Sequence, residues 1–326
     1  MVLFRCDKSG LNINIDLDNN TVGDGGEGKI YKVQNQVAKI YNKLSPEQID
    51  KLKVMVENPP EDPMLHKGHI SIAWPQDLIK NIKTDEYVGF LMPEIQGGQT
   101  LLNVYNPERR KNNAPGFNWL YLHITAQNVA TVVESIHAKK YVIGDIKSEN
   151  FLVNAQGFVS IVDTDSFQIE HPKTGKIYRC LVGSEEYTPP ELVGKNFKII
   201  DRSEIHDHFG LAVIIYKLLF GAHPYQGSGD SDSLDVRISK GHWPHGPQSP
   251  VKMAKWSIPL EIVDAKLQDF FHQCFSEGHN DHQMRPTAKQ WRDALGTAIT
   301  KLIDCKVEIC LNQSGLNFTE RSCSNF

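Results

Sequence analysis

The sequence predicts an α+β protein with two lobes, a small sheet-rich lobe followed by a larger, mainly helical lobe. Residues up to about 97 contain short apolar runs typical of strands and only one helical pattern. From about residue 206 onward, apolar side chains recur at helical spacing. The chain of 326 residues is long enough for two lobes that share a cleft.

The first lobe is expected to hold several strands and one helix. Residues 11–17 alternate between apolar and polar side chains, and residues 30–33 and 36–41 predict a hairpin with a two-residue link. Ser45, Pro46 and Glu47 predict the start of the helix, because they supply an N-cap, a proline in the first turn and an early acid. Two further strands are expected over residues 70–74 and 87–92.

The second lobe is expected to begin after Gly97. Residues 103–118 are polar and indicate a loop, and residues 151–154 and 158–162 predict a short hairpin. Helical periodicity is found over residues 119–139, 208–220, 234–240, 262–274 and 287–303. The predicted division is a first lobe over 1–97, a second lobe over 98–305 and a polar tail over 306–326.

Composition excludes several classes of protein. A formal net charge of −4 argues against a general nucleic-acid binder. No run approaches the length of about eighteen apolar residues that a membrane span needs, and the first residues do not resemble a signal peptide. The six cysteines include no Cys-x-x-Cys pair, which favours free thiols over a disulfide framework or a zinc site. We expect a cytoplasmic protein that binds neither membrane nor nucleic acid.

A glycine-rich stretch before the hairpin contains Gly23, Gly25 and Gly28 in the pattern G-x-G-x-x-G. Glycines let backbone amides approach phosphate oxygens. Dinucleotide-binding folds use the same spacing, but there a helix follows, and here a strand is expected. Lys39 follows between apolar neighbours, which is unusual for a solvated strand face. Beside a phosphate-covering loop, this lysine can hold the α- and β-phosphates of a nucleotide.

A second group of polar residues flanks the hairpin of the second lobe. Asp145, Lys147 and Asn150 precede it, and Asp163 follows it. A single aspartate in a loop is most often a turn residue. Phosphoryl transfer, however, needs a carboxylate to orient a hydroxyl, a cation for the γ-phosphate and oxygen ligands for Mg²⁺. The group therefore predicts this chemistry.

With these motifs in order, the chain resembles a eukaryotic-type serine/threonine protein kinase domain over roughly residues 10–303. Residues 183–191 resemble the segment that closes the activation loop, and Asp207-x-Phe-Gly resembles the start of the central helix. The resemblance implies a bilobal protein-kinase-like fold, with ATP and Mg²⁺ as cofactors. It also implies a buried ion pair between Glu191 and Arg285.

The same resemblance assigns roles to individual residues. Asp145 is expected to be the catalytic base or orienting acid, and Lys147 the cation at the γ-phosphate. Asn150 and Asp163 are the expected Mg²⁺ ligands. The expected nucleotide-binding residues are Gly23, Gly25, Gly28, Ile30, Lys39, the gatekeeper Met92, Glu94 and Ile95 for adenine, and Gln99 for the ribose. For Gln99, a plain turn after a strand remains open.

The sequence departs from the kinase pattern at three places. Gly144 stands where an arginine usually holds an activation-loop phosphate, which implies activity without that phosphorylation. Asp163-Thr164-Asp165 replaces Asp-Phe-Gly, and for Asp165 we favour a structural turn acid over an extra metal neighbour. The glutamate that pairs with Lys39 is expected to be Glu47 or Glu57, with Glu47 favoured because Glu57 adjoins a proline stop.

Rival functions and partners follow from the same motifs. A pseudokinase that acts as an ATP-binding interaction module is disfavoured by the intact Lys39, Asp145, Asn150 and Asp163. A small-molecule kinase is disfavoured by the Pro-Pro-Glu segment and the late Arg-Pro-Thr. The atypical motifs resemble bacterial kinases associated with tellurium resistance. Those kinases imply a von Willebrand-type protein as substrate and a PP2C-type phosphatase as a second partner.

Overall fold

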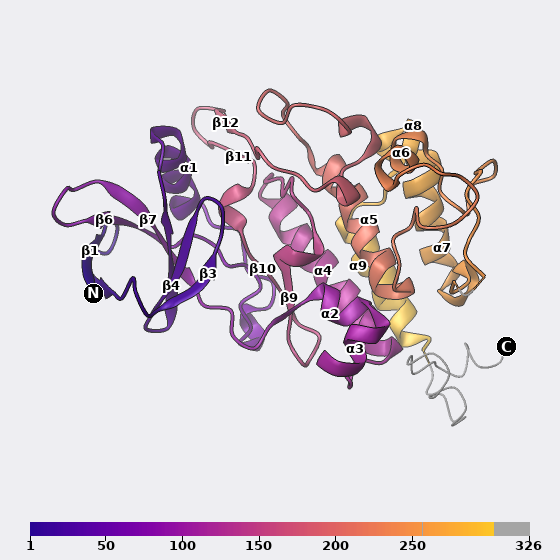
Figure 1. Cartoon of the computed structure of the whole chain (residues 1–326), viewed down its shortest axis with the longest axis horizontal. Helices are drawn as coiled ribbons and strands as arrows, with labels where there is room; N and C mark the ends of the chain where they lie inside the picture. The colour runs from indigo at the N-terminus through magenta and orange to yellow at the C-terminus, as the bar shows by residue number, and fades with distance from the viewer. Residues whose placement is uncertain (256, 303–326) are drawn as a thin grey trace.

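The computed structural model describes residues 1–255 and 257–302, which form a sheet lobe and a helical lobe side by side (Figure 1). The predicted α+β architecture of two lobes is therefore confirmed. The smaller lobe holds an antiparallel sheet in the order β2-β1-β6-β7-β5-β4-β3. Its strands are β1 (Val2–Cys6), β2 (Asn12–Ile15), β3 (Thr21–Asp24), β4 (Gly28–Val33), β5 (Gln36–Tyr41), β6 (Asp77–Asn81) and β7 (Tyr87–Pro93).

The hairpin and the helix of the small lobe form where the sequence predicts them. β4 and β5 pair through to Val33 and Gln36, and the link residue Gln34 adopts a left-handed conformation with φ 54°. Helix α1 (Pro46–Glu57) starts at Ser45, whose hydroxyl accepts from the backbone of Gln48 while the side chain of Gln48 accepts from Ser45. This capping box satisfies two backbone donors that the helix start would otherwise leave unpaired.

One local expectation about the first hundred residues is wrong. Residues 70–74 do not form a strand, and within them only Ile72 makes an isolated bridge, to Ile161. The apolar run is instead buried between the lobes, where Trp74 donates to the carbonyl of Met55 and stacks on Tyr141. Apolar residues buried on all sides lack the alternation of a half-exposed strand, so their pattern does not identify the backbone shape. Strands β1, β3 and β6 were not anticipated.

The larger lobe is mainly helical. The predicted loop over residues 103–118 is wrong, because it holds most of α2 and all of α3, and Asn106 and Pro107 supply the cap and first residue of α3. Its helices are α2 (Leu101–Tyr105), α3 (Pro107–Asn113), α4 (Trp119–Ala138), α5 (Glu204–Phe220), α6 (Leu234–Lys240), α7 (Ala265–His272), α8 (Gly278–Asn280) and α9 (Ala288–Thr300). Its strands are β8 (Gln99–Thr100), β9 (Phe151–Val153), β10 (Val159–Ile161), β11 (Ile169–Glu170) and β12 (Ile177–Tyr178).

Helix α5 forms the centre of the large lobe. It is buried from Asp207 to Phe220 and packs against α4, which in turn packs along α9 (Figure 1). A helix that is apolar all round is stable only when neighbours cover every face. None of the helices in the described part of the chain combines the length and apolarity needed to cross a membrane. The expected tail over 306–326 lies outside the described residues.

The expected ion pair between Glu191 and Arg285 is present in the large lobe. Both terminal nitrogens of Arg285 donate to the carboxylate of Glu191, at 2.6 and 2.7 Å. The Arg285 side chain has no exposed surface. Burial by itself would raise the pKa of Glu191, but the hydrogen bonds and charge of Arg285 outweigh it and hold that pKa below its usual value. The pair ties the segment before α5 to the segment before α9.

Replacing Arg285 with alanine should lower the free energy of unfolding by about 3–5 kcal/mol, because Glu191 would remain buried without its counter-charge. Urea titration followed by circular dichroism measures this change. Arg109→Ala is the matched control, since Arg109 is exposed, and its effect should stay within about 0.5 kcal/mol. Equal small effects for both variants would contradict a structural role for the pair.

Candidate active site

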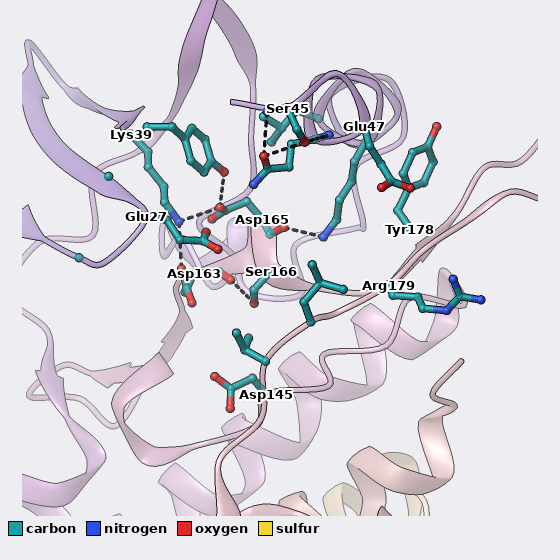
Figure 2. A pocket seen from close by; sticks show the side chains of 18 of the residues that line it. Glu27, Lys39, Ser45, Glu47, Asp145, Asp163, Asp165, Ser166, Tyr178 and Arg179 are labelled. Atoms are coloured by element: carbon teal, nitrogen blue, oxygen red, sulfur yellow. Dashed lines mark hydrogen bonds and ion pairs between the residues drawn. The ribbon is translucent and has the colours of Figure 1, made fainter. Parts of the chain in front are cut away.

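A cavity of about 540 Å³ lies between the two lobes (Figure 2). The glycine turn and β5 line it from the sheet, α1 lines it from one side, and loops of the large lobe close it from below. Its lining includes Gly25, Gly26, Glu27, Gly28, Lys39, Tyr41, Glu47, Lys51, Asp145, Lys147, Asp163 and Asp165. The structure therefore brings the main polar residues of both sequence motifs to one place.

The glycine motif forms the tight turn between β3 and β4. The backbone amides of Gly25 and Gly28 each donate to the carbonyl of the other, at 3.0 and 3.3 Å. A side chain at position 28 would lie 2.3 Å from the carbonyl oxygen of Ile40, so only glycine fits this close approach. Gly23 lies within β3, and its partner in the sheet is Ile30. Gly25 and Gly28 line the cavity directly, and Gly23 and Ile30 build the strands behind them.

Asp145 is held in a fixed orientation inside the cavity. Its side chain is buried, and its two carboxylate oxygens accept from Lys147 at 2.5 Å and from the hydroxyl of Ser184 at 2.8 Å. Burial would lower the pKa of Lys147, but its bond to Asp145 raises that pKa above the usual value. Ser184 was not singled out from the sequence as a site residue, although it lies in the segment that resembles the end of an activation loop.

The loop that carries Asp145 rests on helix α5. Asp207, near the start of this helix, accepts the backbone amides of Ile143 and Gly144 at 2.7 and 2.9 Å. It also bonds to His137 at the end of α4, at 3.0 Å. A buried carboxylate with three donors is well satisfied. The loop that carries Asp145, called the catalytic loop below, is thus attached to α5, which is buried from Asp207 to Phe220.

Asn150 and Asp163 fit the expected metal site. Asn150 is buried and does not line the cavity; its amide nitrogen donates to the carbonyl of Asp145 at 3.0 Å, and its amide oxygen is the atom that would bind a cation. Asp163 adopts a left-handed conformation with φ 59°, and its side chain is 40 % exposed and faces the cavity (Figure 2). Burial and the neighbouring Asp165 raise the pKa of Asp163. An amide oxygen and a carboxylate are suitable ligands for Mg²⁺.

Lys39 lies on β5 and points into the cavity. Its ammonium contacts Asp163 at 3.1 Å and Asp165 at 2.7 Å. Burial would lower the pKa of Lys39, but the charges of Asp165 and Asp163 raise it above the usual value. Neither expected glutamate is its partner. Glu47 is exposed and contacts Lys176 at 3.8 Å, and Glu57 is exposed at the end of α1. The prediction is wrong because Lys51, not an acid, lies on the buried face of α1.

Asp165 is more than a turn acid. It does lie in a single turn of 3-10 helix, Thr164–Ser166, as favoured from the sequence. Its side chain, however, is only 4 % exposed and bonds to both Lys39 and the hydroxyl of Tyr41. Thr164, at the position of the usual phenylalanine, is also buried and donates to the carbonyl of Ala73 at 2.7 Å. The turn of residues 163–166, which carries the expected metal ligand Asp163 and is called the metal loop below, is thus fixed by polar contacts.

The expected adenine and ribose residues lie beyond the cavity lining. Met92 is buried in β7 opposite Val37. Glu94 and Ile95 directly follow that strand, and the carboxylate of Glu94 accepts from Lys32 at 2.8 Å. Gln99 starts β8 and donates to the carbonyl of Asn113 at 3.1 Å. The roles of these four residues in nucleotide binding stay predictions.

Arg202 is a further residue that the sequence did not single out. Its guanidinium donates to the carbonyls of Gly144 at 2.6 Å and of Cys180 and Val182, each at 2.5 Å. It also packs 4.1 Å from the ring centre of Phe197. Gly144 has φ 75°, and a side chain there would lie 2.8 Å from Cys180 and 3.1 Å from Arg202. The absent side chain at position 144 leaves the room that Arg202 occupies.

Comparisons with known proteins agree with this geometry. A family model described as protein kinase domain matches residues 18–294. A curated relative, Protein kinase YegI of Escherichia coli strain K12, is 32 % identical over 299 residues, covering 88 % of this chain and 45 % of the relative. Serine/threonine-protein kinase sgk-1 of Caenorhabditis elegans is 25 % identical over 232 residues, covering 68 % of this chain and 45 % of the relative. The chain thus spans less than half the length of these relatives.

Proposed function

We propose that this chain, which belongs to the protein kinase family, transfers the γ-phosphoryl group of ATP to serine or threonine hydroxyls of a protein. Protein kinases are phosphotransferases that use ATP with Mg²⁺, and these are the cofactors of this family. The observation that carries the proposal is the convergence of Lys39, Asp145, Lys147 and Asp163 on one cavity. The domain division at residue 97 stays part of the proposal, with the cavity between the two parts.

The proposal assigns a role to five polar residues. Bound MgATP supplies the phosphoryl group and the divalent charge. Asp145 orients the hydroxyl and accepts its proton, since the carboxylate is fixed by Lys147 and Ser184. Lys147 offsets negative charge on the transferred group. Asn150 and Asp163 hold Mg²⁺, and Lys39 holds the α- and β-phosphates beside the glycine turn.

The preference for serine and threonine rests on the surroundings of Asp145. Lys147 stands two residues after this acid, as in the serine/threonine kinases that the sequence resembles. Ser184 bonds to the same carboxylate and so joins the end of the activation segment to the catalytic loop. The name of the relative sgk-1 is that of a serine/threonine kinase. The adenine roles of Met92, Glu94 and Ile95 and the ribose role of Gln99 belong to the same proposal.

Independence from activation-loop phosphorylation rests on Arg202. In many protein kinases a phosphate on the activation loop binds arginines and orders that loop. Here the guanidinium of Arg202 joins the catalytic loop, at Gly144, to the activation segment, at Cys180 and Val182, through neutral carbonyls. These contacts need no phosphate. Thr174 lies exposed in the segment between β11 and β12, away from Arg202 in sequence.

Partners and location are part of the same proposal. The atypical motifs resemble bacterial kinases associated with tellurium resistance, so we propose a von Willebrand-type protein as substrate and a PP2C-type phosphatase that reverses the modification. A cytoplasmic location fits the supply of ATP and the free thiols Cys6, Cys180 and Cys274 within the described residues. No role for nucleic acid is proposed for a chain with a net charge of −4.

The central experiment is mass spectrometry of phosphosites after incubation of the chain with MgATP and with candidate substrates. Phosphoserine and phosphothreonine should form with the wild-type chain and should be absent with Asp145→Asn, which keeps the shape of the side chain but removes its charge. Sites on tyrosine alone would contradict the proposed specificity. Equal labelling by the wild type and Asp145→Asn would contradict catalysis by this chain.

Lys147→Ala should lower kcat on the order of 100- to 1,000-fold, because a cation that stabilises the transferred group would be lost. Steady-state kinetics with the substrate found by mass spectrometry measures this change. Lys176→Ala is the matched control, since this lysine is exposed just before β12 and its ion pair is with the exposed Glu47, at 3.8 Å. A loss of less than about tenfold for Lys147→Ala would be inconsistent with the assigned role.

Thr174→Ala should leave the single-turnover rate within about twofold of the wild type, and phosphatase treatment of the wild type should do the same. Arg202→Lys should lower that rate by at least about tenfold, because an ammonium cannot reach three carbonyls in the geometry of a guanidinium. Rapid-quench kinetics with each variant gives the comparison. A large loss in Thr174→Ala, or none in Arg202→Lys, would contradict the proposed ordering of the segment.

A further inference from the structure

We infer that Asp165 positions Lys39 in place of a glutamate on helix α1, so that the alignment of this lysine depends on the metal loop. The inference rests on the proposed function, because it assigns the residue that orients one of its phosphate-binding groups. In protein kinases generally, this lysine pairs with a glutamate of the first helix, and the position of that helix controls activity. In this structure Lys39 contacts Asp165 of the metal loop, and helix α1 presents a lysine, Lys51, to the cavity.

The first observation is the partner set of Asp165. One oxygen of its carboxylate accepts from Lys39 at 2.7 Å and also from the hydroxyl of Tyr41. Lys39 and Tyr41 are two residues apart on β5, so their side chains lie on the same face of the strand. Both are buried, and Tyr41 has a raised pKa because of burial and the charge of Asp165. Tyr41 therefore acts as a neutral donor that holds the carboxylate against Lys39.

The second observation is that the two acids near Lys39, Asp163 and Asp165, differ in distance and exposure. Asp163 also contacts Lys39, but at a longer distance of 3.1 Å, and its side chain is 40 % exposed toward the cavity. The side chain of Asp165 is 4 % exposed. A buried carboxylate needs a buried counter-charge, and Lys39 provides it. Asp163 is thus the acid that remains accessible to a cation, and Asp165 is the acid committed to the lysine (Figure 2).

The third observation is the residue that α1 presents to the cavity. Lys51 is buried on this helix and lines the cavity, and its ammonium donates to the backbone carbonyl of Asp165 at 2.7 Å. Burial lowers the pKa of Lys51. Burying an ammonium group costs free energy unless the group is paired or hydrogen-bonded. Here α1 supplies a hydrogen-bond donor, Lys51, where protein kinases usually have a glutamate that accepts from the lysine. The acceptor is the main chain of the metal loop.

These contacts join three elements at one residue. Strand β5 binds the side chain of Asp165 through Lys39 and Tyr41, and α1 binds its main chain through Lys51. The hydroxyl of Thr164 fixes the same turn to Ala73. Because the turn begins at Asp163, the proposed metal ligand and the proposed phosphate-binding lysine are aligned together. A separate helix movement that delivers a carboxylate to Lys39 is not required.

The test first measures how well Lys39 is protected from acylation in the nucleotide-free chain. An amine-reactive ester is added in short pulses, and the labelling of Lys39 relative to the exposed Lys83 is read by mass spectrometry. Asp165→Asn keeps the size of the side chain but removes its charge, so labelling of Lys39 should accelerate about tenfold. Adding Lys51→Glu, which places a carboxylate on α1, should slow the labelling of Lys39 by at least about threefold relative to Asp165→Asn alone.

The second measurement is the effect of the same variants on kcat and on the KM for ATP. Asp165→Asn should lower kcat by about tenfold or more while the KM changes by less than about threefold, which separates positioning from loss of binding. The double variant should recover part of this loss. Asp77→Asn is the matched control, since Asp77 is similarly buried but accepts the backbone amides of Lys8 and Ser9 instead of a side chain of the cavity, and it should leave both parameters unchanged.

Three results would overturn the inference. Labelling of Lys39 within about twofold of the wild type in Asp165→Asn would show that Asp165 does not hold the lysine. Equally strong exposure of Lys39 in Asp163→Asn would show that Asp165 is not its dedicated partner. Failure of Lys51→Glu to slow labelling in the Asp165→Asn background would show that the two positions are not exchangeable. Labelling needs no turnover, so it decides the inference even where wild type and Asp145→Asn show the same lack of phosphoryl transfer.

Discussion

The contact on which the cavity depends is the pair between Lys39 and the metal loop. It joins the sheet lobe to the helical lobe by a buried ammonium that lies between two carboxylates, Asp163 and Asp165. Charges of this kind are stable in a buried place only when each is compensated. The glycine turn, α1 and the catalytic loop surround this compensated group of charges. The side chain of Asp163 remains 40 % exposed toward the cavity in this arrangement.

The large lobe provides a rigid base for the catalytic loop through a second set of buried polar contacts. Asp207 binds two consecutive backbone amides of that loop, and Arg202 binds the carbonyl of Gly144 from the other side. Arg285 and Glu191 fix the segment before α5. Each contact pairs a buried charge with backbone groups or with an opposite charge. Asp145 thus projects from a loop whose main chain is held on two sides, which is the condition for orienting a substrate hydroxyl.

The sequence predicted those parts of the fold whose signals are local. The hairpin of β4 and β5 and the capped start of α1 follow from neighbouring residues, and both are confirmed. The strand over residues 70–74 was wrong because an apolar run buried between lobes has no diagnostic period. The loop over residues 103–118 was wrong because α2 and α3 are too short to show a clear helical period, and short helices depend on packing.

For the site, the sequence alone predicted which side chains would carry the chemistry, and it determined the order in which they occur. Lys39, Asp145, Lys147 and Asp163 were named from residue type and spacing, and the structure places them around one cavity. It could not determine which acid contacts Lys39 or which arginine donates to the carbonyl of Gly144. Asp165 is 126 residues from Lys39, and Arg202 is 58 residues from Gly144. Such pairs form only when folding brings their atoms within hydrogen-bond distance, and no local pattern encodes that choice. The sequence therefore predicted the residues of the site, and only the tertiary structure decided which of them contact each other.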